Sequence, residues 1–165
     1  MDEQGDQAFR KLDPHGRWAE MGYAGALSFL RRPYSRDAAG ADVVVSGLPW
    51  DGATTNRPGC RLGPRAIRAA SAETAQLMAF PWGFDPFETL KVIDWGDAWI
   101  DPHHPQSVAP AIEAHAAAIL AAGATMLTFG GDHFVTWPLL KAHAAKHGPL
   151  ALIQFDAHGD LWEDD

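Results

Sequence analysis

Short apolar segments alternate with longer helix-like segments between residues 42 and 155, and this alternation most constrains the fold. The first segment, residues 42–48, is the β-branched run Asp-Val-Val-Val-Ser-Gly-Leu, which is typical of a strand buried on both faces. Further strands are predicted at residues 90–93, 125–129 and 150–155.

The segments between these strands predict helices. Pro64 suits the first turn of a helix, because its missing N–H would have no helical partner there. The alanine-rich residues 107–122 predict a second helix closed by Gly123, and a third runs from about Thr136 to Lys146. Strands that alternate with helices of this length form right-handed βαβ units on a parallel sheet. The sequence therefore predicts an α/β fold.

The N-terminal part of the chain lacks this regular pattern. Residues 1–20 are polar and predict an arm, whereas residues 21–165 predict the α/β domain, with a short helix at residues 23–30. The arm lacks the positive-then-apolar order of a signal peptide, and no apolar stretch reaches the roughly 18 residues of a membrane span. We therefore expect a cytoplasmic protein with no membrane partner.

Charge and cysteine content narrow the classes of partner. The chain has 13 Lys and Arg against 21 Asp and Glu, a net charge of -8. Such a surface repels nucleic acid and favours small cationic molecules. The single cysteine, Cys60, cannot form an intrachain disulfide, which fits a reducing compartment.

Two polar segments directly follow the third and fourth predicted strands. They read Gly-Gly-Asp-His at residues 130–133 and Asp-Ala-His-Gly-Asp at residues 156–160. Each segment alone has an ordinary interpretation: the glycines ease a tight turn, Asp156 caps a helix, and His158 is a loop histidine. Ligands of open α/β sheets bind at the carboxyl ends of strands, where both segments are expected. Their joint occurrence there favours a ligand site.

Four side chains of these segments are candidate metal ligands. If the backbone stays extended, Asp156, His158 and Asp160 point to one side of the chain. His133 adds an imidazole from the neighbouring strand end. Oxygen and nitrogen donors without thiolates suit Mn²⁺ rather than a structural zinc ion. Two cations bridged by carboxylates acidify the water held between them, which can then attack an electrophilic carbon.

Other polar residues are assigned lesser roles. Asp132 is a candidate for orienting His133 through a hydrogen bond. Asp94 and Asp97 follow a strand, and helix capping is favoured over a role behind the metal ligands. His115 lies on an alanine-rich helix and is expected to be solvated or at a packing edge.

The two polar segments resemble signature segments of the ureohydrolases, the family of arginase and agmatinase. Residues 55–68, Thr-Asn-Arg-Pro-Gly-Cys-Arg-Leu-Gly-Pro-Arg-Ala-Ile-Arg, resemble the agmatinase branch, as does Phe134. The resemblance extends from about residue 22 to the end of the chain. It implies an arginase-like three-layer αβα sandwich with a parallel sheet.

The resemblance also implies roles for individual residues. His133, Asp156, His158 and Asp160 would be ligands of two Mn²⁺ ions, and Asp160 would also be catalytic, through a hydrogen bond to a bridging hydroxide. That hydroxide would attack the guanidinium carbon of a small cationic substrate. Agmatine, which gives putrescine and urea in polyamine biosynthesis, is the first candidate, and guanidinobutyrate or a related guanidino acid is the second. The full-length protein would be a homo-oligomer.

The sequence departs from the family in its length. Ureohydrolases are typically longer, and a later Asp-x-Asp segment supplies their remaining metal ligands. We therefore expect this chain to be the N-terminal half of such a domain and to be inactive alone. A non-catalytic fragment or pseudoenzyme is an alternative. A deacetylase-like metal hydrolase on a related fold is a third interpretation, which the Arg-Pro-Gly loop disfavours.

Overall fold

The computed structural model describes residues 20–75 and 78–160. In this part of the chain, three strands form one parallel sheet in the order β2-β1-β3. The first three predicted strands are confirmed as β1 (Val43–Gly47), β2 (Val92–Asp97) and β3 (Thr125–Phe129).

Strand β1 lies between the other two because it is apolar on both faces. Val44 and Val45 point to opposite faces of the sheet, and both have an exposed fraction of 0%. On one face, Val44 packs in a core cluster with Ile93 of β2 and with Ile119, which belongs to the helix Val108–Ala121. The valine run thus behaves as expected for a buried central strand.

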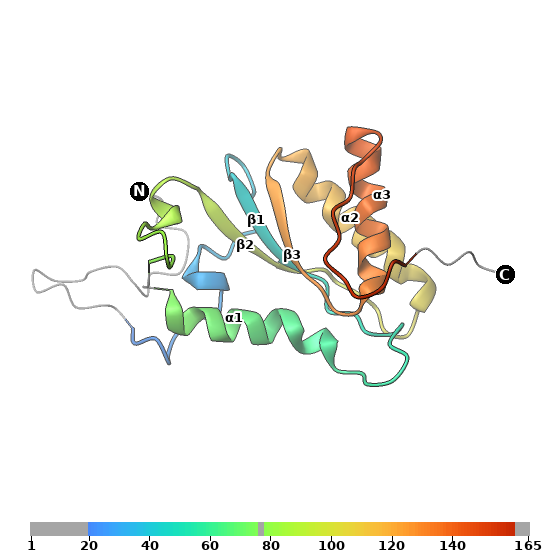
Figure 1. Ribbon diagram of the computed structural model, residues 1–165, viewed down its shortest axis with the longest axis horizontal. Helices are drawn as coiled ribbons and strands as arrows, with labels where there is room; N and C mark the ends of the chain where they lie inside the picture. The colour runs from blue at the N-terminus through green and yellow to red at the C-terminus, as the bar shows by residue number, and fades with distance from the viewer. Residues whose placement is uncertain (1–19, 76–77, 161–165) are drawn as a thin grey trace, which may run out of the picture.

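Helices cover the two faces of the sheet (Figure 1). Helix α1 (Gly63–Thr74) lies on one face, and α2 (Val108–Ala121) and α3 (Thr136–His147) lie on the other. Helix α3 packs on α2, whose Ile112 is fully buried. Gly123 follows α2 with a φ of 83°, the left-handed conformation predicted for its helix-ending position. The chain therefore has the predicted α/β architecture in three layers.

The prediction of a fourth strand at residues 150–155 is wrong. These residues have no regular secondary structure, and all of them are exposed. A strand is stabilised by hydrogen bonds to a neighbouring strand, and no strand pairs with this segment within the described part of the chain. The apolar composition matches that of a buried strand, but composition cannot provide the partner.

The helix predicted at residues 23–30 is also wrong. Only a short 3₁₀ helix, η1 (Phe29–Arg31), forms here. Gly25 has a φ of 87°, which an α-helix does not accommodate. The backbone N–H of Phe29 donates to Oδ2 of Asp94 at 2.7 Å, a long-range bond that takes the place of a helical one.

The predicted arm, residues 1–20, lies outside the described residues except for Glu20. Among the described helices, none is long and apolar enough to cross a membrane.

Candidate metal centre

Strand β3 brings His133 to the carboxyl edge of the sheet. The strand ends at Phe129, and a 3₁₀ helix, η5 (His133–Val135), begins after the two glycines. Asp132 caps this helix, because its Oδ1 accepts a hydrogen bond from the N–H of Phe134 at 3.2 Å. The cap holds His133 at the first position of the helical segment.

Asp132 also joins this segment to the loop after β1. Its backbone N–H donates to the carbonyl oxygen of Trp50 at 2.8 Å, and its Oδ2 accepts from the N–H of Ala53 at 2.7 Å. A Cβ atom on Gly131 would lie 1.7 Å from the same Trp50 oxygen, so only glycine fits there. Backbone N–H groups thus engage both carboxylate oxygens of Asp132, and its predicted role of orienting His133 is wrong.

The second polar segment is bent rather than extended. Oδ1 of Asp156 accepts a hydrogen bond from the N–H of His158 at 2.9 Å, as in an Asx turn. Asp160 has a φ of 49°, in the left-handed region. The side chain of Gln154 donates to Oδ2 of Asp160 at 2.9 Å. The backbone does not stay extended here, so the condition for aligning the three polar side chains along one side is not met.

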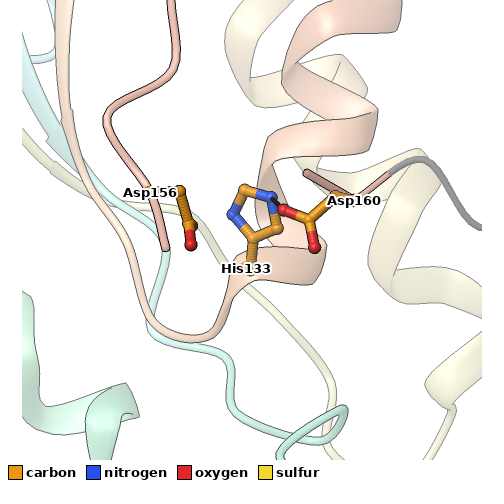
Figure 2. Close-up of side chains that lie close together, drawn as sticks. All are labelled: His133, Asp156 and Asp160. Carbon is orange, nitrogen blue, oxygen red and sulfur yellow. Dashed lines mark ion pairs between the residues drawn. The ribbon is translucent and has the colours of Figure 1, made fainter. Parts of the chain in front are cut away.

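Three of the four predicted ligands nevertheless converge (Figure 2). His133, Asp156 and Asp160 each place one ligand atom within 4.8 Å of the others. Nε2 of His133 lies 2.9 Å from Oδ2 of Asp160, and the imidazole stands between the two carboxylates. His158 is outside this group: its side chain is 84% exposed, with Nδ1 3.5 Å from Oδ1 of Asp156.

The donor set of this group fits a divalent cation. One imidazole nitrogen and two carboxylates, with no thiolate among them, suit Mn²⁺. The backbone N–H of His158 is the main cause that lowers the pKa of Asp156, and the imidazoles of His158 and His133 lower it further. Asp156 therefore stays ionised, as a metal ligand must.

A depression open to solvent adjoins the group. Its volume is about 350 Å³, within the range of small-molecule sites. Gly130, Asp132, His133 and Thr136 are among the residues that line it. Oγ1 of Thr136 lies 3.4 Å from Nδ1 of His133, so this hydroxyl is a hydrogen-bond partner of the imidazole nitrogen that does not contact Asp160.

Sequence reasoning missed the anchoring of the loop after β1. The side chain of Asp51 is fully buried, and its Oδ2 accepts a hydrogen bond from the N–H of Gly59 at 2.7 Å. Its Oδ1 accepts from Nε of Arg61 at 2.5 Å. The Arg61 guanidinium is the main cause that lowers the pKa of Asp51 to about 2. These bonds close the loop at its base.

The roles expected of Asp94 and Asp97 are corrected by the structure. Neither caps a helix; both bind Arg68 of α1, whose Nε lies 2.7 Å from Oδ2 of Asp94 and whose Nη1 lies 2.6 Å from Oδ1 of Asp97. Asp94 is fully buried and Arg68 is 6% exposed. A guanidinium buried in this way needs carboxylate partners, which the end of β2 supplies.

The fold and the site together define an α/β protein with a candidate divalent-metal centre at the carboxyl edge of its sheet. Residues 41–165 match the model of the Arginase family, and the chain belongs to this family.

Similar proteins are agmatinases and a related hydrolase. The chain is 59% identical over 162 residues to the agmatinase of Chromobacterium violaceum, a match that covers 98% of this chain and 50% of that protein. A crystal structure of a hypothetical agmatinase from Burkholderia thailandensis is 58% identical, with a TM-score of 0.87, and the match covers 100% of this chain and 52% of that one. Proclavaminate amidino hydrolase from Streptomyces clavuligerus is 37% identical, with a TM-score of 0.76, over 84% of this chain and 46% of that one. The chain thus spans about half the length of the relatives it matches.

Proposed function

We propose that this chain forms part of a Mn²⁺-dependent ureohydrolase that converts agmatine to putrescine and urea in the cytoplasm. The observation that carries the proposal is the convergence of His133, Asp156 and Asp160 at the carboxyl edge of the sheet. The identity of 59% to the agmatinase of Chromobacterium violaceum supports agmatine as the substrate.

The reaction adds water to the guanidinium carbon and breaks the bond between that carbon and the alkyl-bearing nitrogen. The water oxygen becomes the carbonyl oxygen of urea, and both protons of the water end on the leaving nitrogen, which departs as the ammonium group of putrescine. Two Mn²⁺ ions, when bound, would supply a water acidified to near neutral pH. His133, Asp156 and Asp160 would hold the ions, and the Asp160 carboxylate would also accept a hydrogen bond from the attacking water. His158 is proposed as a fourth ligand. To bind the metal, its exposed imidazole would rotate toward His133, Asp156 and Asp160.

A cationic substrate agrees with the charges of this chain. The site contains two carboxylates, and the whole chain has a net charge of -8. Both favour a guanidinium and the terminal ammonium of agmatine. A guanidino acid such as guanidinobutyrate is the second candidate substrate, because one similar structure is a proclavaminate amidino hydrolase rather than an agmatinase.

A non-catalytic role for this chain alone is the alternative. One observation favours it: His158 lies outside the group formed by the other three predicted ligands. In this alternative the chain binds a single cation without turnover. The two proposals differ in urea release and share the prediction of metal binding.

Metal binding and urea release are therefore measured separately. Binding is followed by the electron paramagnetic resonance signal of free Mn²⁺, and urea release is assayed with agmatine and with guanidinobutyrate. The substitution His133→Ala is expected to weaken Mn²⁺ binding by about tenfold or more. The control is His104→Ala, which removes an exposed imidazole paired with Asp101 in another loop and should leave binding unchanged.

Each outcome separates the proposals. Equal Mn²⁺ binding by the parent chain and by His133→Ala would overturn the candidate metal centre. Mn²⁺-dependent urea release from agmatine by the chain would overturn the non-catalytic alternative, and faster release from guanidinobutyrate would replace the substrate. If this chain releases no urea, but a longer chain that includes the additional sequence of the relatives does, the result would support an agmatinase whose site needs that additional sequence.

A further inference from the structure

Two histidines lie one turn apart at the carboxyl end of helix α3, away from the candidate metal centre. His143 and His147 are four positions apart on this helix, so their side chains project from the same face. Their ring centroids are 6.3 Å apart, and the ring planes differ by 34°. Among the described residues, no other helix carries two histidines. Their spacing thus sets this pair apart from the other histidines of that part of the chain.

A backbone hydrogen bond decides which ring nitrogen of His143 is available to a ligand. Nδ1 of His143 lies 2.9 Å from the carbonyl oxygen of Leu139, one turn earlier on α3. A carbonyl oxygen only accepts, so Nδ1 carries the proton and Nε2 of the neutral ring keeps its lone pair. Histidines that bind metals are usually oriented in this way, by donating the second ring N–H to a carbonyl or carboxylate oxygen. His143 therefore presents Nε2 as a prepared ligand atom.

The second imidazole of the pair is free to adjust its position. His147 is the last residue of α3 and is exposed, and it forms no hydrogen bond or ion pair with another described residue. Rotation of this side chain brings a ring nitrogen to the cation that Nε2 of His143 binds, at the usual metal–nitrogen distance of about 2.1 Å. Two histidines at this spacing hold zinc in the helical His-Glu-x-x-His motif. Ala144 stands where that motif has its catalytic Glu, so the pair predicts metal binding without hydrolysis.

The end of the helix favours a cation at this place. The last carbonyl groups of a helix carry partial negative charge, which attracts cations to the last turn. Lys146, the cationic side chain of this turn, donates to the carbonyl oxygen of Leu120, so its ammonium group is held at α2. We propose that His143 and His147 form a second divalent-metal site, which takes Ni²⁺, Cu²⁺ or Zn²⁺ with water completing the coordination.

The proposed site differs from the candidate metal centre in its donors and in its place. Two imidazoles without a carboxylate suit Cu²⁺, Ni²⁺ and Zn²⁺, whereas carboxylates suit Mn²⁺. A helix rises by about 1.5 Å per residue, so His147 lies roughly 16 Å along α3 from Thr136, which lines the depression at the candidate centre. The two sites are therefore separate, and the inference does not depend on the proposed function.

Ni²⁺ is the probe for this site. It is titrated by isothermal calorimetry into the untagged chain carrying His133→Ala, which lacks one ligand of the candidate metal centre. The pair is expected to bind Ni²⁺, and Mn²⁺ should bind there about tenfold more weakly or worse. Adding His147→Ala should weaken Ni²⁺ binding by about tenfold or more, because the second imidazole no longer acts at high effective concentration. Ni²⁺ should also raise the thermal unfolding temperature of the His133→Ala chain, and this rise should disappear with His147→Ala.

Chelation by two side chains is separated from binding to single exposed histidines. His143→Ala should lose as much Ni²⁺ affinity as His147→Ala, and the double variant should lose no more, because either substitution alone breaks the chelate. The matched control is the double substitution of His103 and His104 by Ala, which removes two neighbouring exposed histidines from the loop after β2. This control should leave Ni²⁺ binding unchanged. His147 is exposed, so its substitution should keep the fold, which circular dichroism checks.

The outcomes of these titrations are distinct. Equal, non-additive losses for His143→Ala and His147→Ala, with the control unchanged, support the site. Additive losses, or an equal loss in the control, would show adventitious binding to exposed histidines and overturn it. Ni²⁺ binding that His147→Ala leaves unchanged would also overturn it. The proposed function is tested by urea release, which none of these measurements uses, so either proposal fails without the other.

Discussion

The carboxylate of Asp132 accepts a hydrogen bond from the backbone N–H of Ala53 at 2.7 Å, and this bond ties the loop after β1 to the segment that carries His133. The backbone of Asp132 adds a second tie to the same loop through Trp50. The Gly-Gly-Asp-His segment therefore holds a ligand and also fixes the loop beside it. This relationship makes Asp132 and Gly131 informative positions for mutation.

The substitution Asp132→Ala is expected to lower the free energy of unfolding by about 0.5–2 kcal/mol, because it removes the side-chain cap of η5 and the acceptor of the Ala53 N–H. Asp132→Asn keeps one acceptor oxygen and should lose less. Urea denaturation of the two variants measures the difference. Equal stabilities of Asp132→Ala and the parent chain would show that the tie to Ala53 contributes nothing.

Gly131→Ala should destabilise the chain by about 1–3 kcal/mol, because overpacking forces the backbone to move. The new Cβ would lie 1.7 Å from the carbonyl oxygen of Trp50. Gly130→Ala is the matched control, since its Cβ would meet only Cγ2 of Val135 at 3.4 Å, an ordinary contact. Thermal unfolding of both variants tests the prediction. A larger loss for Gly130→Ala would contradict it.

Arg68→Met is expected to cost about 3–5 kcal/mol, because it leaves the fully buried carboxylate of Asp94 without its ion-pair partner. The comparison is Lys141→Met, which breaks a pair between Lys141 and Glu113 whose side chains are 48% and 31% exposed. That pair should contribute about 0–1 kcal/mol. Chemical denaturation measures both losses, and similar values for the two variants would count against a structural role for the buried pair.

His115 should make stability depend on pH. Nε2 of His115 is buried without a hydrogen-bond partner, and burial, helped by the charge of Arg36, lowers its pKa from 6.5 to about 4, while Asp97 acts in the opposite direction. Because the unfolded chain binds a proton at higher pH than the folded chain, the stabilising contribution is complete above pH 6.5 and is lost as the pH falls toward 4.

The variant His115→Leu tests this dependence. The difference in unfolding free energy between the variant and the parent chain should change between pH 6.5 and pH 4 and should level off outside that interval. His104→Ala, at an exposed histidine, serves as the control. A constant difference between parent chain and His115→Leu across this interval would contradict the prediction.

His115 is half-buried in the structure and therefore lies at a packing edge, one of the two placements that the sequence predicted.

The elements that were predicted correctly are those with a strong local pattern. The valine run of β1 is apolar on both faces, so its place inside a sheet follows from composition. The alanine-rich helix α2 and the glycine after it have matching local preferences. The failed elements depend on distant partners: residues 150–155 have the composition of a strand without a paired neighbour, and the N–H of Phe29 binds Asp94 instead of forming a helical bond.

The candidate site likewise has features that the local sequence pattern predicted and features that it did not. The position of Gly-Gly-Asp-His after a predicted strand was enough to predict that His133 reaches the carboxyl edge of the sheet. The spacing of two in residues 156–160 suggested an aligned set of ligands, but an Asx turn at Asp156 and the left-handed φ of Asp160 redirect the side chains. Local hydrogen bonds of this kind compete with extended backbone, and the sequence pattern alone does not rank them.

The sequence by itself determined the α/β alternation, the strand ends and the polar segments that follow them, because these depend on side-chain type and short spacing. Only the tertiary structure decided which of those side chains meet. His133 and Asp160 lie 27 positions apart in the sequence and come within 2.9 Å of each other, and Arg68 of α1 pairs with Asp94 of β2. Such pairings follow from the packing of α1 and the strands, and packing is a property of the whole chain rather than of any segment.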